Sequence, residues 1–241
     1  MISVCMATYN GERYIKEQVD SILCQLSEED ELVISDDHSK DSTRDIIKSY
    51  NDDRIKLFLN ELPKGVTHNF ENALLHSSGD IIFLADQDDV WLPNKIKELR
   101  DFLIQGNYDM VTGNCALIDS ELNITQAMFY IKQSPLDKSV CGNWMNNLWL
   151  GSCMAFRRKV VAHDLWIALY GQIHFRCGYY PKVLQLYRRH DNTVSFAGSK
   201  STNKLSYKIN YRLYLAYWLI MRSLMKNKKY EYLFHQSPFQ I

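Results

Sequence analysis

The segment Ile81–Asp89 (IIFLADQDD) decides the fold expected of this chain. Five apolar residues typical of a buried strand lead directly into three carboxylates within four positions. Carboxylates this close repel one another unless a cation lies between them, and Mg²⁺ and Mn²⁺ prefer oxygen ligands. This segment alone is equally compatible with a metal site and with a solvated acidic turn.

From the amino terminus to about residue 105, strand and helix signals alternate with short connections. Apolar runs predict four strands, at 2–7, 31–35, 55–59 and 81–85. Residues spaced as on one helix face separate them, and a further helix is expected from about Pro93 to Gln105. The alternation predicts an α/β fold with a mostly parallel, Rossmann-like sheet covered by helices on both faces.

Three polar clusters follow the predicted strands. Thr8–Gly11 (TYNG) follows the first strand, Asp36–Ser39 (DDHS) the second and Asp86–Asp89 the fourth. Ligands of parallel sheets bind beyond the carboxyl ends of the strands. We therefore expect the three clusters to converge on one site. After Asp109 the pattern is looser, with shorter strands expected at 110–112, 154–156 and 183–187.

The composition is that of a soluble globular protein, but its charge is unevenly distributed. The 28 basic and 28 acidic residues cancel. From Ala197 onward, however, eight basic residues face one acid, so the tail carries +7 and the rest −7. A cationic tail suggests an anionic partner surface. An anionic membrane contacted through residues 203–229 is one candidate partner, and no nucleic acid is expected.

The tail also reads as a helix with interspersed Tyr and Leu. Its longest uncharged apolar stretch, 213–221, has nine residues, whereas a transmembrane helix needs roughly 20. A helix lying on anionic lipid and a helix docked on its own domain or a second subunit are equally compatible with this pattern. Oligomeric state stays open, a homo-oligomer included.

Cysteine usage and the amino terminus both favour a cytoplasmic protein. The six cysteines have no paired spacing, and several lie in apolar segments. We interpret them as reduced core residues, not as a disulfide set or a zinc site. The chain enters a strand at once, so no signal peptide is expected. The expected location is cytoplasmic, at the periphery of the inner face of the cell membrane if the tail binds lipid.

Four segments together resemble family 2 glycosyltransferases with the GT-A fold: Val4–Gly11 (VCMATYNG), Val33–Asp41 (VISDDHSKD), Ile81–Pro93 and His163–Asp164. The nearest resemblance is to the bacterial subgroup that builds capsule, O-antigen and rhamnose-containing polysaccharides. It covers about residues 1–196. It implies a GT-A domain there, with a nucleotide-binding half (1–109) and an acceptor-binding half (110–196), followed by a basic, aromatic-rich helical tail (197–241).

The resemblance also implies roles for individual residues. Asp164 would be the general base, Trp166 and Gly151 would contact the acceptor, and Asp88 and His190 would bind the metal. Of the neighbouring residues Asp36 and Asp37, Asp37 would hydrogen-bond the base. Asp86 would face the ribose. The nucleotide-sugar-binding residues would be Thr8, Tyr9, Asn10, Glu12, Asp36, Asp37, Asp86 and Arg188.

Each of these roles has a structural alternative. Asp36 and Asp37 could cap the following helix, and Asp164 would stabilise a first helical turn in any case. Arg188 could pair with an acidic side chain. His190 could be a loop residue without a task, and Gly151 could belong to a plain strand-entry turn. Asp89 is expected to cap the turn into the helix after Pro93.

The activity implied by the resemblance is metal-dependent, inverting sugar transfer. The donor would be a UDP- or dTDP-linked sugar, the acceptor a hydroxyl of a glycan or lipid-linked glycan, and the cofactor Mg²⁺ or Mn²⁺. A phosphohydrolase or nucleotidyltransferase would need motifs that the chain lacks. A catalytically silent sugar-nucleotide-binding or assembly subunit is the alternative. One departure is notable: only seven residues separate Phe156 from Asp164, where family members carry a longer loop.

Overall fold

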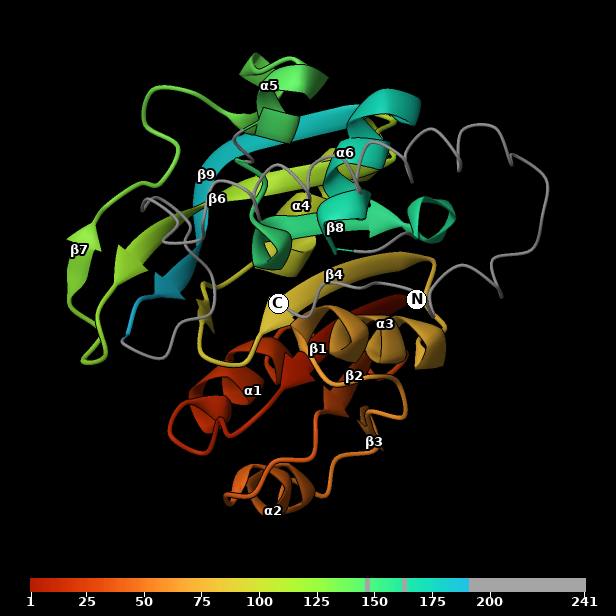
Figure 1. Cartoon of the computed structure of the whole chain (residues 1–241), viewed down its shortest axis with the longest axis vertical. Coiled ribbons are helices and arrows are strands. Elements are labelled where there is room, and N and C mark those ends of the chain that lie inside the picture. Colours follow the sequence, from red (N-terminus) through yellow and green to blue (C-terminus); the bar gives the residue numbers. More distant parts are fainter. Residues whose placement is uncertain (146–147, 162–163, 191–241) are drawn as a thin grey trace.

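The computed structural model describes residues 1–145, 148–161 and 164–190, without the side chains of residues 144, 145, 164–166 and 169 (Figure 1). The predicted tail at 197–241, including residues 203–229 as the candidate membrane contact, lies outside the described residues. Within the described ranges, no helix is both long enough and apolar enough to cross a membrane.

The first half of the chain alternates strands and helices as predicted. Its elements are β1 (Ile2–Thr8), α1 (Ile15–Leu23), β2 (Glu31–Asp36), α2 (Thr43–Lys48), β3 (Ile55–Leu59), α3 (Val66–His76) and β4 (Ile81–Asp86). The second half is less regular. It contains β5 (Val90–Trp91), α4 (Lys95–Gln105), β6 (Met110–Ile118), β7 (Ile124–Gln126), η1 (Pro135–Asp137), α5 (Val140–Met145), η2 (Gly151–Cys153), β8 (Met154–Arg157), η3 (Arg158–Val160), α6 (Asp164–His174) and β9 (Cys177–Arg188).

One mixed sheet runs through both halves in the order β3-β2-β1-β4-β8-β6-β9-β5, with β7 paired to β6 (Figure 1). The four strands from β3 to β4 are parallel. β8 is antiparallel to both of its neighbours, whereas β6 and β9 run parallel to each other. The register places Thr8 beside Asp36, and Ala7 beside Asp86. The polar clusters that follow β1, β2 and β4 therefore lie together at the carboxyl ends of these strands, which we call the site edge of the sheet.

Alternating strand residues cover two separate apolar cores, one on each face of the sheet. Val4, Leu32 and Phe83 pack with α1, α2 and α4, whereas Cys5 and Ile82 pack with α3 and α6, which lie in front of the sheet in Figure 1. Side chains of successive strand residues point to opposite faces, so a strand covered on both faces is apolar throughout. Helices on both faces are thereby confirmed.

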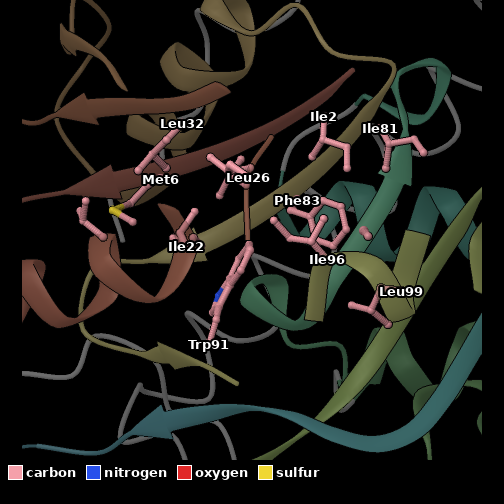
Figure 2. Packing of buried hydrophobic residues seen from close by; sticks show 14 of the residues in the cluster. Ile2, Met6, Ile22, Leu26, Leu32, Ile81, Phe83, Trp91, Ile96 and Leu99 are labelled. Carbon is pink, nitrogen blue, oxygen red and sulfur yellow. The ribbon is translucent and has the colours of Figure 1, made fainter. Parts of the chain in front are cut away.

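The acidic turn does not lead straight into a helix, because β5 intervenes. Val90 pairs with Leu186 on β9, and Trp91 pairs with Gln185. The Trp91 ring contacts Phe83, with centroids 5.9 Å apart, and both belong to the core drawn in Figure 2. The predicted helix therefore begins at Lys95, two residues later than Pro93. Periodicity could not indicate β5, since its partner residues on β9 lie about 95 positions away.

Candidate active site

The carboxyl ends of β1 and β2 are joined through Asp36, the last residue of β2. Its buried carboxylate accepts hydrogen bonds from Thr8 Oγ1 at 3.0 Å and from Ser39 N at 2.8 Å. Arg44 Nε lies 3.7 Å from Oδ1. These contacts fix the loop after β2 against the end of β1. The expected contact of Thr8 and Asp36 with a nucleotide stays a prediction.

The loop after β1 is held by contacts to two other loops. Asn10 adopts the left-handed region, with φ 47°, and its Oδ1 accepts a hydrogen bond from Lys40 N at 2.9 Å. Glu12 Oε2 accepts one from Ser42 N at 2.8 Å. Tyr9 exposes its ring, while Gln87 clamps its backbone through both amide atoms, at 2.9 and 3.0 Å. Three loops therefore converge, as the sequence predicts.

Asp37 lies at the same edge and is nearly buried. Its Oδ1 accepts a hydrogen bond from Asn60 Nδ2 at 2.9 Å, and its Oδ2 accepts one from Gly65 N at 3.0 Å. A carboxylate oxygen has two lone pairs. Each oxygen can therefore accept a further hydrogen bond, such as one from a base N–H group. Recognition of the base by Asp37 stays a prediction.

The acidic turn after β4 is brought against the end of β9. His190 Nε2 lies 2.8 Å from Asp88 Oδ2, and the two side chains keep 15% and 17% of their surface exposed. The carbonyl oxygen of Asp86 accepts a hydrogen bond from Gln18 Nε2 at 2.8 Å, which fixes the turn on α1. The two residues predicted to bind metal are thus adjacent although 102 positions separate them.

Arg188 is 1% exposed, and its guanidinium joins four parts of the chain. It donates to Asp88 O at 2.7 Å, to Ser120 O at 3.0 Å and to Glu17 Oε2 at 2.5 Å. It also lies over the Tyr14 ring, 4.5 Å from the centroid. Arg188 is therefore paired with an acidic side chain, Glu17. Such a pairing was the structural alternative to a role of Arg188 in diphosphate binding. Contact of Arg188 with the diphosphate stays a prediction.

Asp89 does not cap the helix, so that expectation was wrong. Its carboxylate instead points toward β9, where it accepts hydrogen bonds from Gln185 Nε2 at 2.5 Å and from Arg188 N at 2.9 Å. Helix α4 begins after Asn94, whose side chain makes no capping bond. Burial, Asp88 and Asp86 raise the pKa of Asp89, while the hydrogen bond from Arg188 N lowers it. Cross-strand contacts of this kind leave no local sequence signal.

Lys95 extends this buried cluster toward the predicted acceptor side. Its Nζ donates to Gln185 Oε1 at 2.5 Å and to Ser152 O at 2.7 Å, and it lies 3.8 Å from the centroid of the Trp91 ring. Burial lowers the pKa of Lys95 to about 8. The cluster thus connects the acidic turn to η2, which begins at Gly151.

Two predicted acceptor-side residues cannot be placed by their side chains. α6 begins at Asp164, but the side chains of Asp164 and Trp166 lie outside the described part of the structure. The short connection before them contains η3 and continues into residues 162–163, which are also outside it. Gly151, by contrast, is described and opens η2. The roles of all three residues stay predictions.

The donor atoms at the acidic turn fit a hard divalent cation. Asp88 supplies a carboxylate oxygen and His190 an imidazole nitrogen, both partly exposed. Among the described residues, no group of three or more His, Cys, Asp or Glu side chains could hold a metal ion. Mg²⁺ is commonly bound by one or two carboxylates together with substrate phosphates and water. One carboxylate beside an imidazole therefore fits a metal site whose other ligands come from the diphosphate and water.

Sequence reasoning missed three amide side chains and one lysine that hold the loops of the site in place. These residues are Gln18, Gln87, Lys95 and Gln185. Each reaches a partner that lies more than 50 positions away along the chain. The only available signal was polarity within apolar surroundings, as at Gln185 in a strand and at Gln18 on the buried face of α1.

Residues 3–165 match the model of the family described as Glycosyl transferase family 2. Among curated proteins, the chain is similar to the UDP-Glc:alpha-D-GlcNAc-diphosphoundecaprenol beta-1,3-glucosyltransferase WfgD of Escherichia coli. The two are 34% identical over 120 residues, which cover 50% of this chain and 47% of that protein. The chain spans about half the length of the first curated relatives that it matches.

Solved structures share the fold. S. aureus TarS in complex with UDP-GlcNAc matches with a TM-score of 0.68 and 18% identity, over 88% of this chain and 65% of that chain. Glucosyl-3-phosphoglycerate synthase from Mycobacterium tuberculosis in complex with Mg²⁺ and uridine-diphosphate matches with a TM-score of 0.57 and 17% identity, over 79% and 72%. At such identities the likeness establishes the fold alone, and the predicted α/β fold of GT-A type is confirmed.

Proposed function

The chain belongs to glycosyl transferase family 2, and on that premise we propose that it moves a sugar from a nucleotide-diphospho-sugar to a hydroxyl group of a glycan or lipid-linked glycan. One observation carries this proposal. The loops after β1 and β2 meet the Asp88–His190 pair at one edge of the sheet. A nucleotide at the loops would thereby have its diphosphate beside the pair of metal-binding side chains.

We propose that the donor is a UDP-linked or dTDP-linked sugar. The name of the E. coli relative specifies a UDP-glucose donor and an undecaprenol-linked acceptor, and two fold neighbours were solved with UDP-GlcNAc or UDP. Asp37 would accept a hydrogen bond from the base, and Asp86 would face the ribose. A polysaccharide of the cell surface is the product class that such an acceptor supports.

Asp88 and His190 would hold Mg²⁺ or Mn²⁺, one of which accompanies UDP in a fold neighbour. When bound, such an ion stabilises the negative charge that develops on the departing diphosphate. The chain's own contribution is to keep the two donor atoms side by side. Gln18 and Arg188 do so by fixing the backbone carbonyls of Asp86 and Asp88.

Asp164 is proposed as the general base, at the amino end of α6. A hydroxyl group must lose its proton as it attacks the sugar, and a carboxylate within hydrogen-bond reach can accept that proton. A base on the face opposite the leaving diphosphate gives a single displacement, so the configuration at the sugar carbon inverts. This follows the geometric logic of inverting glycosidases. Trp166 and Gly151 would contact the acceptor.

Thermal denaturation with UDP, dTDP or GDP, each with and without Mn²⁺, tests the donor class. Because a ligand that binds only the native state stabilises it, a diphosphate at 100 times its Kd adds about 2.7 kcal/mol to the free energy of unfolding. We expect UDP or dTDP to raise the melting temperature only when Mn²⁺ is present. Absence of a shift with every nucleotide would rule out the proposal.

Two single substitutions separate metal binding from catalysis. Asp88→Asn should abolish the Mn²⁺-dependent shift, because it removes an anionic ligand. Asp164→Asn should keep that shift and lower the transfer rate by about 10²- to 10⁴-fold, the usual contribution of a general base. The matched control is Asp53→Asn, an exposed carboxylate in the turn before β3 at the opposite edge of the sheet. Transfer that survives Asp164→Asn would show that the base is another residue.

A further inference from the structure

A buried polar cluster lies behind the acidic turn, and the proposed chemistry does not use it. We call it the Lys95 network, and its four members come from four separate segments of the chain: Asp89, Lys95, Ser152 and Gln185. Their exposed fractions are only 0–2%. Burying polar and charged groups is costly unless they are hydrogen-bonded, so the contacts within the cluster determine what it can do.

The hydrogen bonds of the Lys95 network run in one fixed direction. A lysine ammonium can only donate and a carboxylate can only accept. Gln185 therefore turns its oxygen to Lys95 Nζ, at 2.5 Å, and its nitrogen to Asp89 Oδ2, also at 2.5 Å. The same nitrogen reaches Ser152 Oγ at 2.9 Å. Reversing either end would place two donors or two acceptors face to face.

The network ends on the residues that carry the metal-binding pair. Asp89 Oδ1 accepts a hydrogen bond from Arg188 N at 2.9 Å, and Arg188 Nε donates to Asp88 O at 2.7 Å. His190 follows two residues later, with Nε2 2.8 Å from Asp88 Oδ2. Asp89 thus fixes the end of β9 against the acidic turn, and this register brings His190 to Asp88.

We propose that Lys95, Gln185 and Asp89 are positioning residues, which hold Asp88 and His190 at the spacing that a divalent cation requires and tie that pair to the acceptor-side turn at Ser152. This inference rests on the proposed function and adds a second layer of residues to its metal site. Groups that orient metal ligands typically change metal affinity by 10- to 100-fold when they are altered.

Stability alone does not account for the network. Replacing buried charged groups by apolar residues of similar volume is often neutral or stabilising. A purely structural cluster at this place could therefore be apolar. What an apolar cluster could not provide is a directional connection from η2 through β9 to the backbone of the acidic turn.

Exchanging the carboxylate at position 89 with the amide at position 185 tests the network. The exchange keeps the number of carboxylates and the number of amides in the network unchanged. Asp89→Asn leaves an amide nitrogen facing a donor, either Gln185 Nε2 or Arg188 N, and Gln185→Glu places a carboxylate against Asp89. The double variant reverses the hydrogen bond between the two positions. The new amide at 89 donates to the new carboxylate at 185, which still accepts from Lys95, and the amide oxygen at 89 still accepts from Arg188 N. Net charge is unchanged.

The measurement is the Mn²⁺ concentration that gives half-maximal stabilisation by UDP. We expect each single variant to raise it about tenfold or more and the double variant to return it to within about threefold of wild type, as for coupled neighbours. Ser152→Ala, which removes one acceptor, should give a smaller rise. The control is Gly79→Ala, a substitution at the opposite edge of the sheet, expected to lower the melting temperature but not to alter the Mn²⁺ requirement.

Two results would overturn the inference. One is an unchanged Mn²⁺ requirement in Ser152→Ala and in every folded single variant. The other is a folded double variant as impaired as its parents. A wild-type protein that shows no Mn²⁺-dependent response to any nucleoside diphosphate would instead overturn the proposed function itself, and the two failures are thereby distinguishable.

Discussion

Glu31 carries a buried negative charge at the amino end of β2, at the opposite edge of the sheet from the acidic turn. Its carboxylate accepts hydrogen bonds from Ser3 Oγ at 2.5 Å, Ser78 N at 2.6 Å and Lys56 Nζ at 2.5 Å. Burial raises the pKa of Glu31, but the bonds from Lys56, Ser3 and Ser78 outweigh it and bring the pKa to about 2. The charged form is therefore the one that the fold stabilises.

This depressed pKa predicts an acid-sensitive fold. The unfolded chain binds the Glu31 proton near pH 4.5 and the folded chain only near pH 2. The stabilisation is therefore fully present above pH 4.5 and is lost as the pH falls toward 2, by at most about 3 kcal/mol. Urea denaturation of wild type from pH 7 to pH 2 should show this loss, and Glu31→Gln should remove the part due to Glu31.

The matched control for Glu31 is Glu121, an exposed carboxylate paired with Arg13 at 3.1 Å. Exposed ion pairs contribute about 0–1 kcal/mol, so Glu121→Gln should leave both stability and its pH dependence nearly unchanged. At pH 7, Glu31→Gln should cost about 1–3 kcal/mol because buried donors lose a charged acceptor. Equal pH profiles for wild type and Glu31→Gln would contradict the role given to Glu31.

Individual residues differ in how far the sequence predicts them. The acidic turn and the two loops could be predicted because their residues adjoin strand ends, and parallel strands bring those ends together. The partners of these residues could not. Gln185 and Asp89 meet across 96 positions, and only the pairing of β5 with β9 brings them together.

At the scale of elements, the four parallel strands of the first half were predicted best, the buried strands β1, β2 and β4 as well as the partly exposed β3. The predicted bounds of β3 are those observed, and β1, β2 and β4 each extend one residue further. β6 and β9 are much longer than predicted, at nine and twelve residues. Polar residues such as Asn114 and Gln185 interrupt their apolar runs, and they are tolerated because hydrogen bonds satisfy them.

Gly79, in the connection from α3 to β4, is packed so closely against β1 that we expect it not to tolerate a larger side chain. A Cβ added there would lie 2.6 Å from Ser3 N and 2.8 Å from Ile2 C, both backbone atoms of β1. Since neither atom can move independently, Gly79→Ala should lower the free energy of unfolding by about 1–3 kcal/mol. Urea denaturation followed by tryptophan fluorescence measures this change.

Gly113 on β6 is the matched control for Gly79. A Cβ added there would meet the Leu99 and Leu184 side chains at 3.5–3.7 Å, which is ordinary van der Waals contact. Gly113→Ala should therefore change the free energy of unfolding by about 1 kcal/mol or less. Equal losses in the two variants would show that the approach of the α3–β4 connection to β1 is not rigid.

At the scale of the whole molecule, the two predicted halves are joined by one sheet, and each of the two apolar cores contains residues of both halves. β4 from the first half pairs with β8 from the second, and β5 pairs with β9 at the far end of the sheet. α4 packs against β6, β8 and β9. The division at 109/110 therefore lies within one sheet, and which half binds the nucleotide and which the acceptor stays a prediction.

This interleaving predicts that residues 1–109 do not fold alone. Without the second half, β4 loses its partner β8, and Leu99 loses the cover of Val111, Ala155 and Leu184 in the shared core. Urea denaturation of the fragment, followed by circular dichroism, should give a broad change without a cooperative transition. Residues 1–190, which contain every described element, should give a sigmoidal transition whose m-value reflects the full surface exposed on unfolding. A cooperative transition of the 1–109 fragment, with an m-value in proportion to its length, would instead make the nucleotide-binding half an independent folding unit.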